Sequence, residues 1–263
     1  MKAIRTLTTA FAAILAISSC QERIPDPDNF VGFIEKSYTR TSYTSDDRSM
    51  KTRWEGGDYI IVMKDCLESR QYPEEHCCAY MASQGGDCVN LIQMDVNEPA
   101  APYVAYYPQE VAFGLLPDEQ RYRPDGPDKA PMIAKSPTKY LMFRPMCGVI
   151  EFMISTQLNN AVLKTITLQT EQKLCGQYDI VDDVKAVAMG EKKITLICTN
   201  GVELGNEPKP FYIYVPENNY TGATLTLKMT DGRTEEFRIK EGRTIDVTRA
   251  KVTTCPVSEY FDD

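Results

Sequence analysis

The stretch YLMFRPMCGVIEFMIS, from Tyr140 to Ser155, decides the fold class of this chain. In an extended backbone, successive side chains point to opposite faces of the strand. The side chains of one face are apolar: Met146, Ile150, Phe152 and Ile154. The other face is also largely apolar: Cys147, Val149, Glu151 and Met153. Because both faces are apolar, we expect a strand that is central in a sheet or packed on both sides.

Short strand-like runs continue after this stretch: VLKTITLQT, KITLIC, FYIYVP, ATLTLKMT, TEEFRIK and RTIDVT. In the fourth run Leu225, Leu227 and Met229 share one face, as the period of a strand requires. The runs recur about every 8 to 15 residues, and TDGR at 230–233 is a hairpin signal between two of them. The pattern predicts an all-β antiparallel sandwich with little helix.

The first half of the chain carries runs of the same kind: YIIVM (59–63), VNLIQM (89–94) and YVAYY (103–107). Glycine-rich turn signals separate them. The segment from Leu116 to Lys139 then contains five prolines in 24 residues, which is typical of a connection. We therefore expect two β-sandwich domains in tandem, at 30–138 and 139–263.

The N-terminus has the features of an export signal. Met1 to Arg5 is positively charged, and Ala10 to Ile17 is an apolar run of eight residues, too short for the roughly 20 that cross a bilayer. Ile17, Ser18 and Ser19 precede Cys20 and resemble the bacterial lipoprotein signal, which implies that Cys20 is the acylated first mature residue. The alternative is an ordinary cleavage site near Ser18 or Ser19. We expect a signal peptide at 1–20 and a polar, proline-containing tether at 21–29.

Composition limits the function classes. The formal net charge is −8 and the calculated isoelectric point is near 4.9. A chain this acidic lacks the basic surface that nucleic-acid binding needs. We therefore expect no nucleic-acid partner, and contact with a membrane through a lipid anchor alone.

Eight cysteines follow Cys20, and export favours disulfides. Four of them lie close together, so a hairpin joined by one or two bridges is one hypothesis: Cys66, Cys77, Cys78 and Cys88. Buried free thiols that pack as small apolar groups are the other. The spacing does not match a zinc site, and His76 and Cys78 would face away from Cys77 in a strand. We expect no metal.

The chain offers little for catalysis. His76 is the one histidine, so a Ser-His-Asp or Cys-His site would have to use it. No spacing singles out a pair of carboxylates, and no glycine-rich phosphate loop precedes a helix. We expect a protein that is not an enzyme and has no cofactor. Trp54, the sole tryptophan, is either a core anchor or a surface for stacking a sugar together with Tyr106 or Tyr107.

An ordered set of blocks resembles the fimbrillin-like surface proteins of bacteria. These blocks span 39–220: TRTSY with TRWEGGDYIIVM, YVAYYP, LPDEQRY, PMIAKS, LMFRPMCGVIEFMIS and FYIYVPENNY. The resemblance implies a lipoprotein precursor with two transthyretin-like β-sandwich domains. It also implies a place in fimbriae, as a stalk subunit or at the tip or base.

The resemblance further implies assembly by strand exchange after proteolysis. In the family, cleavage after an arginine releases an N-terminal strand, and another subunit fills the exposed groove by β-augmentation. The candidate here is Arg40, with Arg48 and Arg53 as weaker choices, and the released segment would include Phe30 to Thr39. The alternative is that Arg40 is an ordinary exposed strand arginine.

The chain departs from the polymerising members at its C-terminus. RTIDVTRAKV reads as the last core strand, and the remaining TTCPVSEYFDD has little apolar pattern with which to donate a strand. We therefore predict a tip-like or accessory fimbrial subunit at the outer membrane surface, joined to other fimbrial subunits, with host protein or glycan as a further candidate partner. The alternative is a monomeric, lipid-anchored lipoprotein that binds glycan or protein through loops of the same fold.

Overall fold

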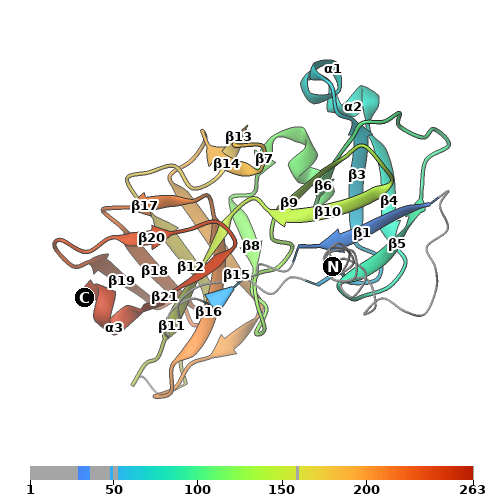
Figure 1. The fold of residues 1–263 in the computed structure, drawn as a ribbon. Coiled ribbons are helices and arrows are strands. Elements are labelled where there is room, and N and C mark those ends of the chain that lie inside the picture. Colours follow the sequence, from blue (N-terminus) through green and yellow to red (C-terminus); the bar gives the residue numbers. More distant parts are fainter. Residues whose placement is uncertain (1–28, 36–47, 50–52, 158–159, 263) are drawn as a thin grey trace, which may run out of the picture.

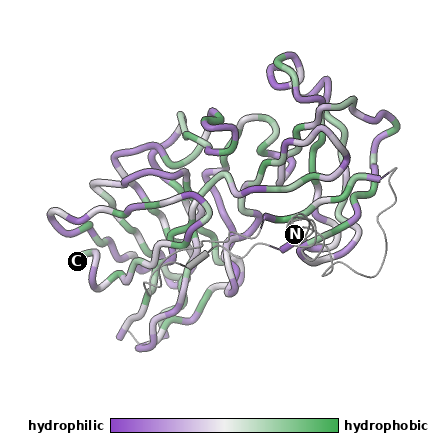
Figure 2. Tube along the Cα trace, in the orientation of Figure 1, coloured by the Kyte–Doolittle hydropathy of each residue, from purple (hydrophilic) through white to green (hydrophobic). Residues whose placement is uncertain are grey.

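The structure is a computed structural model that describes residues 29–35, 48–49, 53–157 and 160–262. It is an all-β protein with 53% strand and 8% helix, which confirms the predicted class and the low helix content. Figure 1 shows two strand-rich units joined side by side, and Figure 2 shows hydrophobic segments along their strands and hydrophilic segments at the outer turns.

The first unit is a closed barrel of seven strands (Figure 1). Their order around the ring is β1 (Phe30–Ile34), β10 (Tyr140–Pro145), β9 (Met132–Ser136), β6 (Tyr103–Tyr107), β3 (Tyr59–Lys64), β4 (Cys78–Ala82) and β5 (Cys88–Gln93). We predicted a sandwich for 30–138, and this part of the prediction is corrected, because β1 pairs with both β10 and β5 and so closes the ring. The transthyretin-like assignment stays a prediction.

Alternating side chains fill the barrel interior, as in other small barrels. Trp54 lies inside it, edge to face with Tyr107 and Phe143 at centroid distances of 5.2 and 5.0 Å. Two short helices, α1 (Leu67–Gln71) and α2 (Pro73–His76), project from the connection between β3 and β4 (Figure 1). Pro73 opens α2, where its missing N–H costs nothing.

The second unit packs two sheets face to face. One sheet has the order β16 (Lys209–Val215), β11 (Gly148–Ile154), β21 (Lys251–Pro256) and β2 (Arg48–Ser49). The other has the order β22 (Phe261–Asp262), β19 (Thr234–Ile239), β18 (Thr224–Met229), β12 (Val162–Gln169), β15 (Lys193–Glu203) and β8 (Glu119–Arg121). Phe152 meets Phe261 across the sandwich at 6.2 Å between ring centroids.

Smaller elements complete the second unit. They are the three-stranded sheet β14 (Lys185–Ala188), β13 (Gly176–Val181) and β7 (Leu115–Leu116), the pair β17 (Asn218–Tyr220) and β20 (Ile245–Val247), and the helix α3 (Val257–Tyr260). The 3-10 helix η2 (Gln109–Phe113) lies between β6 and β7.

Apolar packing joins the two units. Ile61, Met63 and Val104 of the barrel are buried. They belong to the same buried cluster as Phe152 and Ile166 of the sandwich. One continuous core therefore runs from the outer side of the barrel strands into the sandwich.

The stretch from Tyr140 to Ser155, for which we predicted one strand, forms two. Its first part, β10, lies in the barrel, and its second part, β11, lies between β16 and β21 in the sandwich. Gly148 begins β11 at a tight approach, because an added Cβ would lie 2.3 Å from the Thr248 carbonyl oxygen. The prediction of a central strand buried on both faces is confirmed for β11, in which Met153 alone is not fully buried.

The C-terminal residues 251–262 are part of the sandwich core. Our prediction that RTIDVTRAKV is the last core strand was therefore wrong. The chain turns at Ala250, whose φ is 62°, and then enters β21, which runs parallel to β11. Cys255 is fully buried and Phe261 is 3% exposed. The β-branched pair Thr253 and Thr254 suits this strand, although its apolar pattern is weak.

Candidate functional site

The candidate site is the position of β1 in the barrel. β1 runs parallel to β10, with Val31 opposite Tyr140, and antiparallel to β5, with Val31 opposite Asn90. Figure 1 shows β1 in dark blue between these two strands. Both neighbours come from far along the chain, so β1 closes a ring that the rest of the barrel leaves open.

Three inward positions of β1 contact the barrel interior, and Val31, on the opposite face, is also buried at 1% exposed. Phe30 meets Tyr80 and Tyr103 edge to face, at centroid distances of 4.9 and 4.8 Å. Gly32 lies where an added Cβ would be 3.4 Å from the Trp54 ring. Ile34 is 9% exposed and belongs to the barrel core. The inward face of β1 is therefore part of the core.

Hydrogen bonds and charges hold both ends of β1. The Val31 amide donates to the Lys139 carbonyl oxygen at 2.9 Å, and the Glu35 amide donates to the Phe143 carbonyl oxygen at 2.9 Å. The Lys139 ammonium lies 5.6 Å from the centre of the Phe30 ring, a cation–π geometry. At the other end, Glu35 and Arg144 form an ion pair at 3.3 Å.

Without β1, the barrel would expose both unpaired backbone groups and the apolar interior that β1 covers. The facing edges of β10 and β5 would lose their backbone partners, and unpaired edges recruit other strands. Burying a large apolar side chain contributes roughly 1.5 to 3 kcal/mol, so the vacated positions of Phe30 and Ile34 would also attract an apolar strand. The arrangement can therefore hold one extended segment, and its chemistry is that of a strand acceptor.

The predicted processing residues flank β1 in the sequence. Cys20 and Arg40 are outside the described residues, as is 36–39 of the segment predicted to be released. The described part of that segment, 30–35, contains β1. Of the weaker cleavage candidates, Arg48 lies in β2 and pairs with Val252 of β21. Arg53 is exposed and forms an ion pair with Asp87 at 3.5 Å.

Cys66, Cys77 and Cys78 are free thiols in the structure, so it contains no bridge between any two of these three. Four others are buried: Cys147, Cys175, Cys198 and Cys255. Burial raises the pKa of Cys175 and of Cys198 to about 11. Cys66 differs, because a hydrogen bond with the Ser69 hydroxyl at 3.2 Å lowers its pKa.

The structure buries the aromatic residues considered for ligand stacking. Trp54 is 2% exposed, Tyr106 is 7% exposed and Tyr107 is 5% exposed. Trp54 and Tyr107 are in contact inside the barrel, whereas Tyr106 belongs to the core shared with the sandwich. In this arrangement the Trp54 ring offers no free face to a sugar, and the core-anchor alternative describes its surroundings.

His76 lies at the end of α2, with Nε2 4.0 Å from the Glu68 carboxylate. Within the described ranges, no three His, Cys, Asp or Glu side chains are grouped so that they could hold a metal ion. Nor is any helix in the part of the chain that the structure describes both long and apolar enough to span a membrane.

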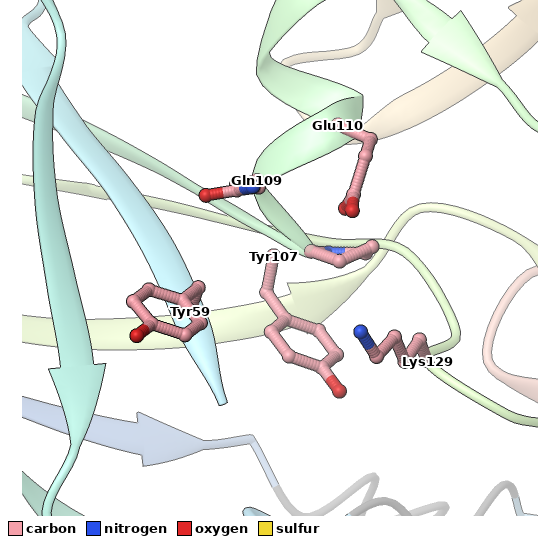
Figure 3. A pocket seen from close by; sticks show the side chains of 6 residues that line it. Tyr59, Tyr107, Gln109, Glu110 and Lys129 are labelled. Atoms are coloured by element: carbon pink, nitrogen blue, oxygen red, sulfur yellow. The ribbon is translucent and has the colours of Figure 1, made fainter. Parts of the chain in front are cut away.

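A small open pocket lies beside the barrel where β6 meets η2 (Figure 3). Its lining is Tyr59, Tyr107, Pro108, Gln109, Glu110 and Lys129. The Tyr107 hydroxyl donates to the Asp58 carboxylate at 3.1 Å, and burial raises the pKa of Asp58. Our sequence reasoning named Tyr107 alone among these residues. The positions of Tyr59 and Lys129 depend on distant pairing, so no local signal could have revealed the pocket.

Comparisons with known proteins give structural neighbours only. No family model matches the chain, and no curated protein matches it. It is similar to a protein of Bacteroides ovatus with a proposed role in cell adhesion, at 12% identity and a TM-score of 0.49, covering 91% of this chain and 95% of that one.

A second neighbour, from Bacteroides uniformis and also with a proposed role in cell adhesion, has 14% identity and a TM-score of 0.46, with coverage of 84% of this chain and 96% of the other. A fimbrial protein of Bacteroides ovatus has 10% identity and a TM-score of 0.37, covering 90% of this chain and 50% of that one.

Proposed function

We propose that this chain is a fimbrillin-like surface lipoprotein, a structural or adhesive subunit of fimbriae that is assembled by β-strand exchange. The observation that carries the proposal is β1: a strand near the start of the sequence that closes the barrel between β10 and β5. One cut after this strand can separate it without breaking the rest of the fold.

The proposed sequence of events begins with cleavage after Arg40. The cut separates β1 from the remaining barrel strands, which are joined to one another through the rest of the chain. When β1 leaves, β10 and β5 expose their edges, and a strand from another subunit takes its place. Exchange of one strand for another restores the same backbone hydrogen bonds, so it can proceed with a small net change in free energy.

The packing of the C-terminal strand favours a subunit that accepts a strand from a partner and does not donate one. β21 is hydrogen-bonded to β11 on one side and to β2 on the other, and Cys255 is fully buried. Withdrawing this strand would open the sandwich core. We therefore propose a tip-like or accessory position in the fimbrium, and no stalk role.

The proposed location is the outer membrane surface. Cys20 would carry the acyl chains, and the segment 21–29 would separate the membrane from β1. Cleavage after Arg40 would then release the protein from its own anchor together with β1. The proposed partners are other fimbrial subunits, and the proposed role is binding and not catalysis.

Co-isolation of the protein with fimbriae tests the proposal. We expect the wild-type chain in SDS-resistant ladders of subunits, and we expect Arg40→Ala to remain a lipidated monomer that enters no ladder. Arg53→Ala is the matched control, because Arg53 is exposed and its ion pair with Asp87 lies at the surface. If the Arg40→Ala protein joined ladders as wild type does, cleavage there would not be the trigger.

A second candidate function is a monomeric lipoprotein that binds glycan or protein through its loops. The pocket lined by Tyr59, Gln109 and Lys129 favours it, because an exposed aromatic ring beside hydrogen-bonding groups suits a sugar edge (Figure 3). Tyr59 is 44% exposed. A glycan array measures this binding. Loss of glycan binding in Tyr59→Ala would support this function, whereas unchanged binding would show that the pocket is not the glycan site.

A further inference from the structure

We infer that the groove between β10 and β5 selects its strand by three alternating positions: an aromatic residue, then glycine or alanine, then an aliphatic residue. This inference rests on the proposed strand exchange and adds the chemistry of the partner strand. Its basis is the set of contacts that β1 makes, since any replacement strand enters the same space.

The first position is an aromatic socket. Tyr80 and Tyr103 hold Phe30 edge to face on two sides, with interplanar angles of 69° and 82°. The Lys139 ammonium lies 5.6 Å from the centre of the same ring and is itself paired with Glu98 at 2.7 Å. Edge-to-face and cation–π contacts favour an aromatic ring over an aliphatic chain of similar volume. This end of the groove therefore selects Phe or another aromatic side chain.

The second position is restricted by size. An added Cβ at Gly32 would lie 3.4 Å from the Trp54 ring and 3.6 Å from each methyl of Leu91, which is ordinary van der Waals contact. Alanine therefore fits, but a longer side chain would have to displace two buried groups. The groove is closed at this point to any residue larger than alanine.

The third position accepts an aliphatic side chain with less selectivity. Ile34 is buried at the rim of the barrel, where its amide donates to the Asp87 carbonyl oxygen at 3.1 Å. Phe33, between the second and third positions, points outward and lies 6.3 Å from Tyr140 between ring centroids. Phe33 is only partly buried, so its side chain contributes little to selection.

The groove also fixes the direction of the strand that occupies it. In addition, its side-chain preferences do not match residues 251–262 as the donated strand. The occupying strand must run parallel to β10 and antiparallel to β5. Within 251–262 no aromatic residue is followed at alternate positions by a small and then an aliphatic residue. The partner that we propose is a strand of another fimbrial subunit that carries the aromatic–x–small–x–aliphatic pattern.

Peptide competition tests this selectivity. A recognition site for a sequence-specific protease is placed after Arg40 in the full-length protein. The chain is cut there and incubated with synthetic peptides of residues 29–36, and occupancy is read by native mass spectrometry. We expect the wild-type peptide and Phe33→Ala to enter within about threefold of each other, and Phe30→Ala to enter at least about tenfold more weakly. Gly32→Ala should enter and Gly32→Leu should not.

The outcomes separate the inference from the proposed function. Equal entry of all peptides would overturn the selectivity and leave strand exchange standing. Entry of no peptide, wild type included, would overturn strand exchange itself.

A second measurement uses the uncut full-length chain. We expect amide hydrogen exchange in 30–35 to be faster in Phe30→Ala than in Phe33→Ala, because the inward ring holds the strand. Equal exchange rates in the two variants would overturn the aromatic socket whether or not peptides enter.

Discussion

The ring of Phe30 meets the ring of Tyr103 edge to face, with centroids 4.8 Å apart and an interplanar angle of 82°. The two residues lie more than seventy positions apart in the sequence and on strands that are not neighbours in the barrel. Their contact crosses the interior, so β1 is tied to the middle of the core as well as to its two hydrogen-bonded neighbours.

Truncation of this ring should be costly. We predict that Phe30→Ala lowers the free energy of unfolding by about 3 to 5 kcal/mol, because it removes a fully buried aromatic side chain and leaves a cavity. Urea denaturation of the full-length protein measures the change. The same truncation at Phe33, which faces outward, should cost clearly less, and equal losses would show that the barrel interior does not hold β1.

Local sequence patterns predicted the individual strands well. YIIVM and YVAYY became β3 and β6, and TLTLKM became β18 with the predicted alternation of buried and partly exposed residues. Apolar period and turn residues carry this information within a few positions. The same information predicted the all-β class and the low helix content.

Local sequence patterns could not predict which strands that are distant in the sequence pair with one another. Nothing local to Phe30–Ile34 indicates that it joins Tyr140–Pro145 to Cys88–Gln93 and closes a barrel. The break after Pro145 was missed because the apolar run continues through it. β21 was missed because its pairing with β11, and not its own apolar content, buries it.

Gly148 offers a test of the crossing between barrel and sandwich. An added Cβ would lie 2.3 Å from the Thr248 carbonyl oxygen and 2.6 Å from a Val247 methyl, so the backbone must shift. We predict that Gly148→Ala lowers the free energy of unfolding by about 1 to 3 kcal/mol. Gly205→Ala is the control, since nothing lies within 4 Å of its added Cβ, and it should stay within about 0.5 kcal/mol of wild type.

Thiol reactivity should follow the environments of the cysteines. The Ser69 hydrogen bond lowers the pKa of Cys66, so more of this thiol is ionised at pH 8 than of an ordinary one. Burial raises the pKa of Cys255 to about 12, so it stays protonated there. We predict that iodoacetamide at pH 8 labels Cys66 long before Cys255, as peptide mass spectrometry can show.

Ser69→Ala is the matched variant for this prediction. Loss of the hydrogen bond raises the pKa of Cys66, which reduces its thiolate fraction and slows alkylation at pH 8, whereas the difference should vanish well above pH 9. A Cys66 that reacts only after a reductant is added would contradict the free thiol and favour one of the bridges.

Trp54 is the sole tryptophan, so its fluorescence reports on the barrel alone. The ring is 2% exposed and lies against the position of Gly32 in β1. We predict weak quenching by acrylamide in the intact chain and strong quenching when β1 is displaced. Emission that changes on addition of a glycan while β1 stays in place would contradict the core-anchor role of this ring.

The most direct test of the account is the intact mass of the protein recovered from assembled fimbriae. Strand exchange predicts a chain that begins at Thr41, without acyl groups and without residues 30–34. A chain in the fimbriae that still begins at lipidated Cys20 and retains β1 would contradict the claim that this strand is released to admit another.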